Sequence, residues 1–141
     1  MMGKLSPDDP EVQKLSYELA MYEQHAKSLE TKIKQIQNEI NNATLTLEAL
    51  KHLKKDKEVF YSIGSGMLIR GKVTDDSVVI TDIGSNTLIE MDVDKAIQVV
   101  SDRLSHLKEE FQETNRVFVE TVAHLEKLNR RAREMLKDIK E

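Results

Sequence analysis

Four histidines and no cysteine limit the metal and nucleophile chemistry available to this sequence. His25 and His124 are the pair of interest, because the helical pattern described below predicts that they face each other across two antiparallel helices. Two imidazoles without a thiolate or a set of carboxylates are too few ligands for a zinc site. We therefore predict no metal site, and we interpret all four histidines as flank or surface residues.

Gly64-Ser65-Gly66 has the composition of a loop that binds phosphate. It leads into a β-type pattern rather than a helix, however, and no Lys-Ser or Lys-Thr pair follows it, so a nucleotide site is not indicated. The serines also lack the G-x-S-x-G context of an activated nucleophile. We expect no cofactor and no catalysis, and hence a protein that is not an enzyme.

The candidate for contact with nucleic acid is the basic stretch of Lys127, Arg130, Arg131 and Arg133. Glu126 and Glu134 flank these basic residues and Asp138 follows them, no aromatic residue accompanies them, and the whole chain has a net charge of −4. Proteins that bind the phosphate backbone are normally basic. We interpret the stretch as a solvated helix face and predict no nucleic-acid partner.

Residues 10–55 carry an uninterrupted heptad pattern, in a chain of 141 residues that is 33% charged and 39% hydrophobic. A 3.5-residue period held over this length predicts a helix supercoiled against a partner helix. The helix is expected to begin at Ser6-Pro7 or at Asp9-Pro10. Its seam positions are Val12, Leu15, Leu19, Tyr22, Ala26, Leu29, Ile33, Ile36, Ile40, Ala43, Leu47 and Leu50.

Residues 95–141 repeat the pattern, after a helix start near Asp92 or Asp94. The seam positions are Ile97, Val100, Leu104, Leu107, Phe111, Thr114, Phe118, Thr121, Leu125, Leu128, Ala132, Met135 and Ile139. The similar lengths of the two helices favour an antiparallel coiled-coil hairpin. Charge agrees with this pairing, because residues 1–25 hold two Lys and five acidic residues, whereas residues 126–141 hold six Lys or Arg and four acidic residues.

Residues 58–93 change to a period of two and contain an internal repeat offset by 20 residues. Each copy reads as strand, Gly-Ser turn, strand, which predicts two β-hairpins joined at residues 74–77. Four short strands beside a narrow coiled coil leave an apolar face and open edges uncovered, so we infer an oligomerisation module. Its apolar face is expected to consist of Val59, Tyr61, Ile63, Met67, Ile69, Val73, Val79, Ile83, Ile89, Met91 and Val93.

The predicted fold is α+β, with a long antiparallel two-helix coiled coil flanking two tandem β-hairpins that complete a β-barrel between subunits. Three segments make one structural unit: the first helix in 1–57, the hairpins in 58–93 and the second helix in 94–141. No apolar run is long enough to span a bilayer and the N-terminus lacks a signal-peptide pattern, so we expect no membrane partner and a cytoplasmic location.

This organisation resembles the alpha-class subunits of the prefoldin family over the whole chain, and archaeal ones most closely. The local match is residues 59–71, VFYSIGSGMLIRG, and it returns at residues 80–90, ITDIGSNTLIE. One departure is Asn86, where the second turn of the family often has Gly; Asn tolerates positive φ, so we expect the turn to form. Another is Tyr61-Ser62, where archaeal relatives often carry Val-Pro.

The resemblance implies a hexameric chaperone of two alpha and four beta subunits whose hairpins build a double β-barrel. It also implies that unfolded client proteins are held at the coiled-coil tips without ATP and passed to a group II chaperonin. The candidate client-binding residues are Leu5, Val12, Leu15, Tyr17, Leu19, Met21, Tyr22, Val122, Leu125, Leu128, Met135, Leu136 and Ile139. Those on the seam have the simpler alternative role of holding the helices together, and the alternative function is a structural scaffold or filament subunit without clients.

Overall fold

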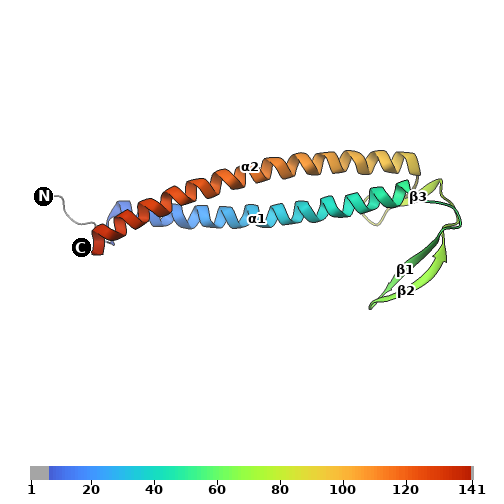
Figure 1. The fold of residues 1–141 in the computed structure, drawn as a ribbon, viewed down its shortest axis with the longest axis horizontal. Coiled ribbons are helices and arrows are strands. Elements are labelled where there is room, and N and C mark those ends of the chain that lie inside the picture. The colour runs from blue at the N-terminus through green and yellow to red at the C-terminus, as the bar shows by residue number, and fades with distance from the viewer. Residues whose placement is uncertain (1–6, 141) are drawn as a thin grey trace. The chain divides into compact units, whose positions relative to one another are not determined.

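The computed structural model describes residues 7–140, with side chains through residue 138, and shows the predicted α+β arrangement (Figure 1). The elements in chain order are α1 (Pro10–Lys51), β1 (Glu58–Gly64), β2 (Met67–Lys72), β3 (Val78–Asp82), β4 (Leu88–Asp92) and α2 (Val93–Lys140). The described chain divides into two compact units. Unit 1 combines the residues up to Asn38 with those from Glu109 onward, and unit 2 is Glu39–Lys108.

Helix α1 begins at the second of the two predicted starts. The Asp9 side chain caps it, because Oδ1 of Asp9 accepts a 2.9 Å hydrogen bond from the backbone N–H of Glu11. A carboxylate at this position satisfies an N–H group that has no partner within the helix, and its charge is favourable near the positive end of the helix dipole. Helix α2 follows β4 without a loop, and the N–H of Val93 donates to the carbonyl of Ser77 at 2.9 Å.

In unit 1 the two helices pack antiparallel along the predicted seam. The contacts that show this are an ion pair between Lys32 and Glu110 at 3.7 Å and, nearer the start of α1, a cluster that joins Leu15 to Leu128 and Met135. Thr114 and Thr121, small members of the seam, are buried. The Thr121 hydroxyl donates to the carbonyl of Val117 at 2.7 Å, so this buried polar group is hydrogen-bonded.

Unit 2 contains the adjoining parts of α1 and α2 together with both hairpins. Its helices are joined by the same type of apolar seam, with Leu107 and Ala96 buried, and Glu39 contacts Arg103 at 3.6 Å. Every predicted seam position with a described side chain, in either unit, is buried or half-buried. The heptad prediction is therefore confirmed along both helices.

The β1–β2 hairpin pairs antiparallel, with Val59 opposite Gly71 and Tyr61 opposite Ile69. The register shifts between Ser62 and Gly64, which places a bulge at the end of β1. Gly64, Ser65 and Gly66 all have positive φ, at 96°, 52° and 76°. Glycine adopts this conformation without steric cost, so the Gly-Ser-Gly sequence suits the turn.

The β3–β4 hairpin repeats this construction with Val79 opposite Met91 and Thr81 opposite Ile89. Its turn uses Gly84, Ser85 and Asn86, again all at positive φ, and Asn86 lies at 60°. The expectation that Asn86 forms the turn in place of Gly is confirmed. The two hairpins are separate two-stranded sheets, so the described chain does not close a barrel by itself.

The segment between the hairpins is held by aspartates. Asp75 Oδ1 accepts hydrogen bonds from the backbone N–H of Ser77 at 2.8 Å and from its hydroxyl at 2.6 Å. The neighbouring Asp76 accepts from the backbone N–H of Lys55 at 3.1 Å, which connects this segment to the loop after α1. Short polar side chains that bond the backbone two residues ahead are typical of tight turns.

These bonds predict an acid-sensitive turn. The Ser77 hydroxyl and N–H, which bond the carboxylate directly, lower the pKa of Asp75 below its ordinary value. The stability that this pairing contributes is therefore present above the pKa of Asp75 in the unfolded chain, and it is lost as pH falls through the lowered folded value. Carboxyl-detected NMR titration should show Asp75 titrating below the ordinary pKa of an aspartate. Ser77→Ala should raise the pKa of Asp75 toward the ordinary value, and an unchanged pKa in that variant would contradict the assignment.

Candidate functional site

The tip is defined as the end of the helix pair where α1 begins and α2 ends (Figure 1). It contains a small apolar core. The core consists of the buried Leu15, Leu128 and Met135 with the partly buried Val12, Leu19, Tyr22 and Ala132 packed against them. Six of the predicted client-binding residues are thus brought together, and what the structure shows them doing is joining α1 to α2. Two further candidates, Val122 and Leu125, are half-buried on α2.

Three other candidates lie off the seam and are exposed. Tyr17 and Met21 on α1 have exposed fractions of 67% and 54%, and Leu136 on α2 is similarly open to solvent. The helix partner does not cover these side chains, so they are available to another molecule. Leu5 lies outside the described residues, as does the side chain of Ile139.

The exposed candidates border two shallow grooves, each formed along a single helix. The first lies on α1 and is lined by Tyr17, Ala20, Met21, Gln24, His25 and Ser28. The second lies on α2 and is lined by Asn129, Ala132, Arg133 and Leu136. Both combine apolar side chains with uncharged polar or basic ones, and neither has the enclosed form of a small-molecule pocket. Surfaces of this kind suit contact with a flexible polypeptide, since Met side chains adapt to different partners.

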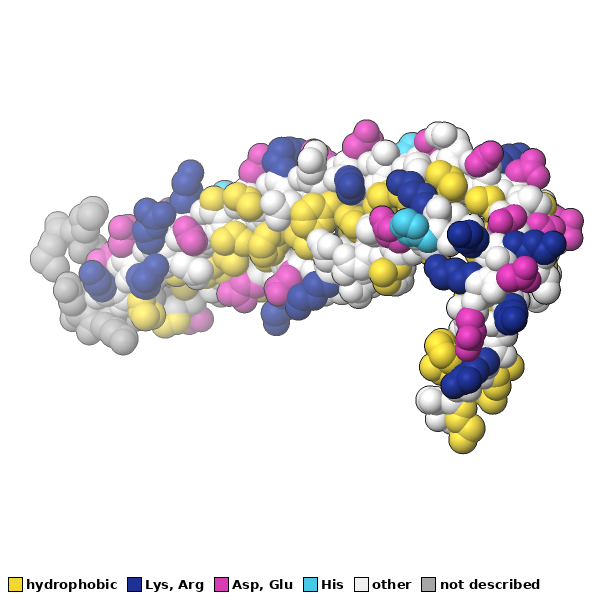
Figure 2. All heavy atoms as spheres, turned by 45° about the vertical axis from the view of Figure 1, so that its right-hand side comes forward, with side chains coloured by type: hydrophobic (Ala, Val, Ile, Leu, Met, Phe, Trp, Pro, Cys, Tyr) yellow, Lys and Arg dark blue, Asp and Glu magenta, His cyan; other side chains and the backbone are white. Residues whose placement is uncertain are grey.

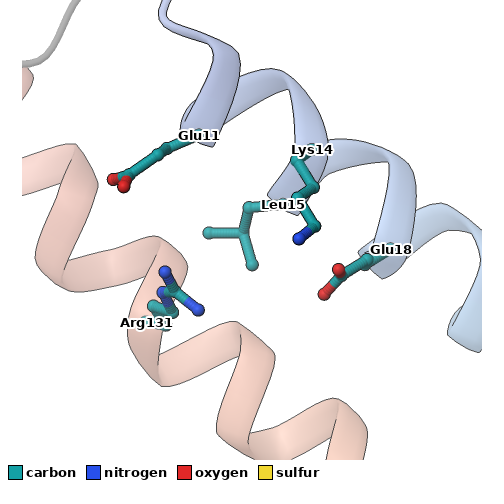
Figure 3. Close-up of a pocket in the computed structure, with 5 residues that line it drawn as sticks. All are labelled: Glu11, Lys14, Leu15, Glu18 and Arg131. Carbon is teal, nitrogen blue, oxygen red and sulfur yellow. The ribbon is translucent and has the colours of Figure 1, made fainter.

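Side chains of opposite charge from the two helices line one cleft at the tip (Figure 3). Arg131 of α2 lies opposite α1, facing the buried Leu15 with Glu11 and Glu18 on either side, and Lys14 reaches the same cleft of about 130 Å³. This matches the predicted pairing of an acidic first arm with a basic last arm. Exposed charges of this type contribute little stability, but they favour the antiparallel direction.

The predicted pairing of the two histidines across the helices is wrong. The ring of His124 packs against Tyr22, with centroids 4.4 Å apart and planes tilted by 49°, whereas His25 is exposed and lines the groove beside Tyr17 and Met21. Tyr22 precedes His25 by about one helical turn, so the seam residue Tyr22 occupies the place opposite His124 where the imidazole of His25 was expected. Among the described residues, no group of three or more His, Asp or Glu side chains is placed to hold a metal ion.

The hairpins form the second candidate surface, and most of the predicted apolar face is solvent-exposed. Tyr61, Ile63, Met67, Ile69, Ile83 and Ile89 are exposed, whereas Val59, Val79 and Met91 are half-buried. Tyr61 packs across the strand onto Gly71, where a Cβ atom would collide with the phenol ring. An aromatic ring that covers a glycine on the neighbouring strand stabilises a hairpin lacking a third strand.

The opposite face of each hairpin is also apolar, and the period-two reading missed this. Phe60, Leu68, Ile80 and Leu88 have exposed fractions between 60% and 69%. Figure 2 shows hydrophobic side chains gathered on the β1–β2 hairpin. The available signal was the run Val59-Phe60-Tyr61, because adjacent large apolar residues are typical of strands covered on both faces. Each hairpin thus exposes large apolar residues on both faces, and on the second face they lie beside charged residues such as Arg70 and Glu90.

Within the described part of the chain, neither α1 nor α2 is apolar enough over a sufficient length to cross a bilayer.

Comparison with protein families identifies one match, to the model described as "Prefoldin subunit", over residues 22–140. Prefoldin subunit alpha of Pyrococcus horikoshii is 26% identical over 135 residues, covering 93% of this chain and 91% of the relative. Prefoldin subunit alpha of Methanoregula boonei is 31% identical over 103 residues, covering 72% of this chain and 67% of the relative.

Two solved structures share the fold. A filamentous PFD from Methanocaldococcus jannaschii, determined by cryo-EM, has a TM-score of 0.65 at 21% identity and covers 82% of this chain and 98% of that chain. The crystal structure of the prefoldin beta subunit from Thermococcus strain KS-1 has a TM-score of 0.61 at 17% identity, covering 89% of this chain and 91% of that chain. These two structures show that the chain shares their fold, in which β-strands lie between two long helices in the sequence.

The two groups of tip residues predict different stability effects. Leu128→Ala removes buried atoms from the tip core and should cost about 2 kcal/mol or more of unfolding free energy. Tyr17→Ala removes an exposed side chain and should change it by about 0.5 kcal/mol or less. Thermal unfolding followed by far-UV circular dichroism, at one protein concentration, measures both. Equal losses of stability in the two variants would show that Tyr17 is a packing residue after all.

Proposed function

The chain belongs to the prefoldin family as an alpha-class chaperone subunit, and from this premise we propose that its tip captures unfolded proteins without ATP. In this proposal the captured chains are protected from aggregation and then delivered to a group II chaperonin in the cytoplasm. The observation that carries the proposal is the exposed apolar surface of Tyr17, Ala20 and Met21 on α1, which the seam between the helices does not use.

The properties of this surface fit a binder with many clients. Its groove is open rather than enclosed, so it sets few steric limits on the bound sequence. Each tip presents only a few large apolar side chains, which is too small a surface for tight binding. Several tips on one assembly would bind the same client together, and linked weak contacts of this kind raise the overall affinity strongly.

We further propose that the assembly contains two alpha and four beta subunits joined through the hairpins. Support comes from the amount of apolar surface that β1–β4 leave exposed, since isolated two-stranded hairpins are marginal in water and a third strand or a packing layer is needed. The helices do not supply that layer, because their apolar residues face each other along the seam. Other subunits are the remaining source of cover.

The scaffold alternative has no observation in its favour. The filamentous assembly named for the Methanocaldococcus jannaschii structure is a property of that protein, and at 21% identity the likeness extends to the fold. The exposed tip surface would also have no role in a scaffold, whereas it has one in a chaperone.

Removing two exposed tip side chains should weaken capture strongly without unfolding the subunit. The double variant Tyr17→Ser/Met21→Ser should need at least about tenfold more assembly to suppress aggregation of a denatured model protein, because small losses at each tip multiply across the assembly. Light scattering during dilution of the denatured protein measures this. The matched control is Leu45→Ser/Val99→Ser, which removes two exposed apolar side chains from unit 2 and should leave suppression unchanged.

Full suppression by the tip variant would move the client contacts away from Tyr17 and Met21. Equal losses in both double variants would instead show that any exposed apolar residue on the helices contributes. Suppression has to be compared at equal assembly, which a mass measurement of each variant in complex with the beta subunit establishes.

Assembly itself should depend on the hairpins. Ile69→Asp/Ile89→Asp places a charge on the predicted apolar face of each hairpin, where burial without a partner is costly. The hexamer should dissociate while the helical circular dichroism signal largely persists, as measured by native mass spectrometry and far-UV spectra. Leu45→Asp/Val99→Asp adds the same charges to the helices and should assemble normally. An intact hexamer from the hairpin variant would overturn the assignment of these faces.

A further inference from the structure

The two grooves of the tip differ in charge. Among the described residues, the lining of the α1 groove around Tyr17 and Met21 contains no Lys, Arg, Asp or Glu. The lining of the α2 groove contains Arg133 together with the exposed Leu136. A flexible chain that reaches the tip therefore meets a neutral apolar surface on one helix and a basic apolar surface on the other.

Helix geometry places further basic residues along one edge of the α2 groove. Residues three or four positions apart are neighbours on a helix surface. Arg130 precedes Arg133 by three positions and Lys137 follows it by four, so these cationic side chains form one line, here called the basic edge. All three side chains are exposed. Glu126 extends the line by one turn and is next to its first member alone.

The positive charge of the basic edge is not neutralised within the described part of the chain. Arg70, Arg103 and Arg116 each form an ion pair with a glutamate, whereas no member of the basic edge does so within residues 7–138. Arginines elsewhere in the chain thus have an acidic partner of their own. The charges along the α2 groove remain available to another molecule.

A second line of side chains on the same part of α2 is balanced in charge. Its members, two basic and two acidic, are Lys127, Arg131, Glu134 and Asp138. Arg131 of this line is directed toward α1, between Glu11 and Glu18 (Figure 3). Unneutralised basic charge at the end of α2 is therefore concentrated beside the groove rather than distributed around the helix.

We propose that the α2 groove selects segments of unfolded client chains in which acidic residues lie next to apolar ones. Leu136 contacts the apolar side chain, and Arg133 with the rest of the basic edge pairs with the neighbouring Asp or Glu of the client. Arginine suits this role because its planar guanidinium binds a carboxylate through two parallel hydrogen bonds. The inference rests on the proposed capture function and names the class of segment that one groove takes.

Charge at the edge of the groove supplies selectivity rather than tight binding. Exposed ion pairs contribute little each, but complementary charge speeds encounter and like charge excludes the wrong partner. Basic segments are repelled by the basic edge, whereas neutral apolar segments fit the α1 groove. Two grooves of different charge on one tip widen the range of sequences that a single subunit holds.

Peptides that differ in charge alone test this selectivity. Three unstructured peptides of equal length carry the same Leu and Phe residues, separated by Asp, Ser or Lys. Fluorescence anisotropy with the full-length chain in low salt should show the acidic peptide binding at least about fivefold more tightly than the basic one. The difference should shrink as salt is raised, because these charges are exposed and screened. Arg130→Glu/Arg133→Glu should reverse the order, with far-UV circular dichroism checking that the variant remains folded.

Two matched variants locate the effect. Lys127→Glu/Lys108→Glu reverses the same number of charges, on the balanced line and in unit 2, so it should keep the preference for the acidic peptide. Leu136→Ser removes the apolar member of the α2 groove. It should weaken binding of the acidic peptide more than binding of the neutral peptide, which the α1 groove still holds.

The outcomes separate this inference from the proposed function. Equal affinity for acidic and basic peptides, or loss of the preference in the Lys127 and Lys108 control as well, would overturn the selectivity of the groove while suppression of aggregation persists. Failure of all three peptides to bind would also overturn it, and failure of the assembly to suppress aggregation would overturn the proposed function too. A single-stranded RNA oligonucleotide that binds more tightly than the acidic peptide, through Arg130 and Arg133, would assign the basic edge to nucleic acid instead.

Discussion

The apolar seam between α1 and α2 is the interaction on which the rest of the structure depends. It occupies one narrow side of each helix. Its most deeply buried members, Ile36 and Leu107, still have exposed fractions of 3% and 4%. A seam of this width satisfies two helices but cannot extend to cover a sheet. The hairpins that interrupt the helical sequence therefore keep their apolar side chains exposed. This exposed surface is a physical reason why members of the family are subunits of an assembly.

The same constraint explains why the tip can carry function. Side chains on the seam are committed to helix packing, so a large apolar residue off the seam is not covered by the partner helix. Tyr17 and Met21 are in this position, and the chain retains them in solvent although polar residues would suit an exposed helix face better. Under the proposed function, assembly and client capture use different residues of different units, so one can change without the other.

How much of this was predictable depended on the range of the interactions involved. The heptads specified the seam, the turn residues specified both hairpins, and the tolerance of Asn86 for positive φ followed from its side chain. The register of one helix against the other was harder to predict, because a coiled coil allows neighbouring registers of similar energy. As a result, Tyr22 rather than His25 contacts His124. Alternation also hid the exposed apolar residues on the second face of each hairpin, because a period of two assumes that one face is solvated. Phe60 and Ile80 instead follow the rule for strands covered on both sides.

The central claim is that assembly covers the hairpins and leaves the tip open. Hydrogen exchange measured by mass spectrometry, comparing the isolated chain with the chain in its complete assembly, tests this directly. The account predicts strong new protection across β1–β4 on assembly, no change in the turn of α1 that holds Tyr17 and Met21, and protection of that turn only when an unfolded protein is added. Protection of the tip on assembly, with hairpins exchanging as fast as in the isolated chain, would contradict it.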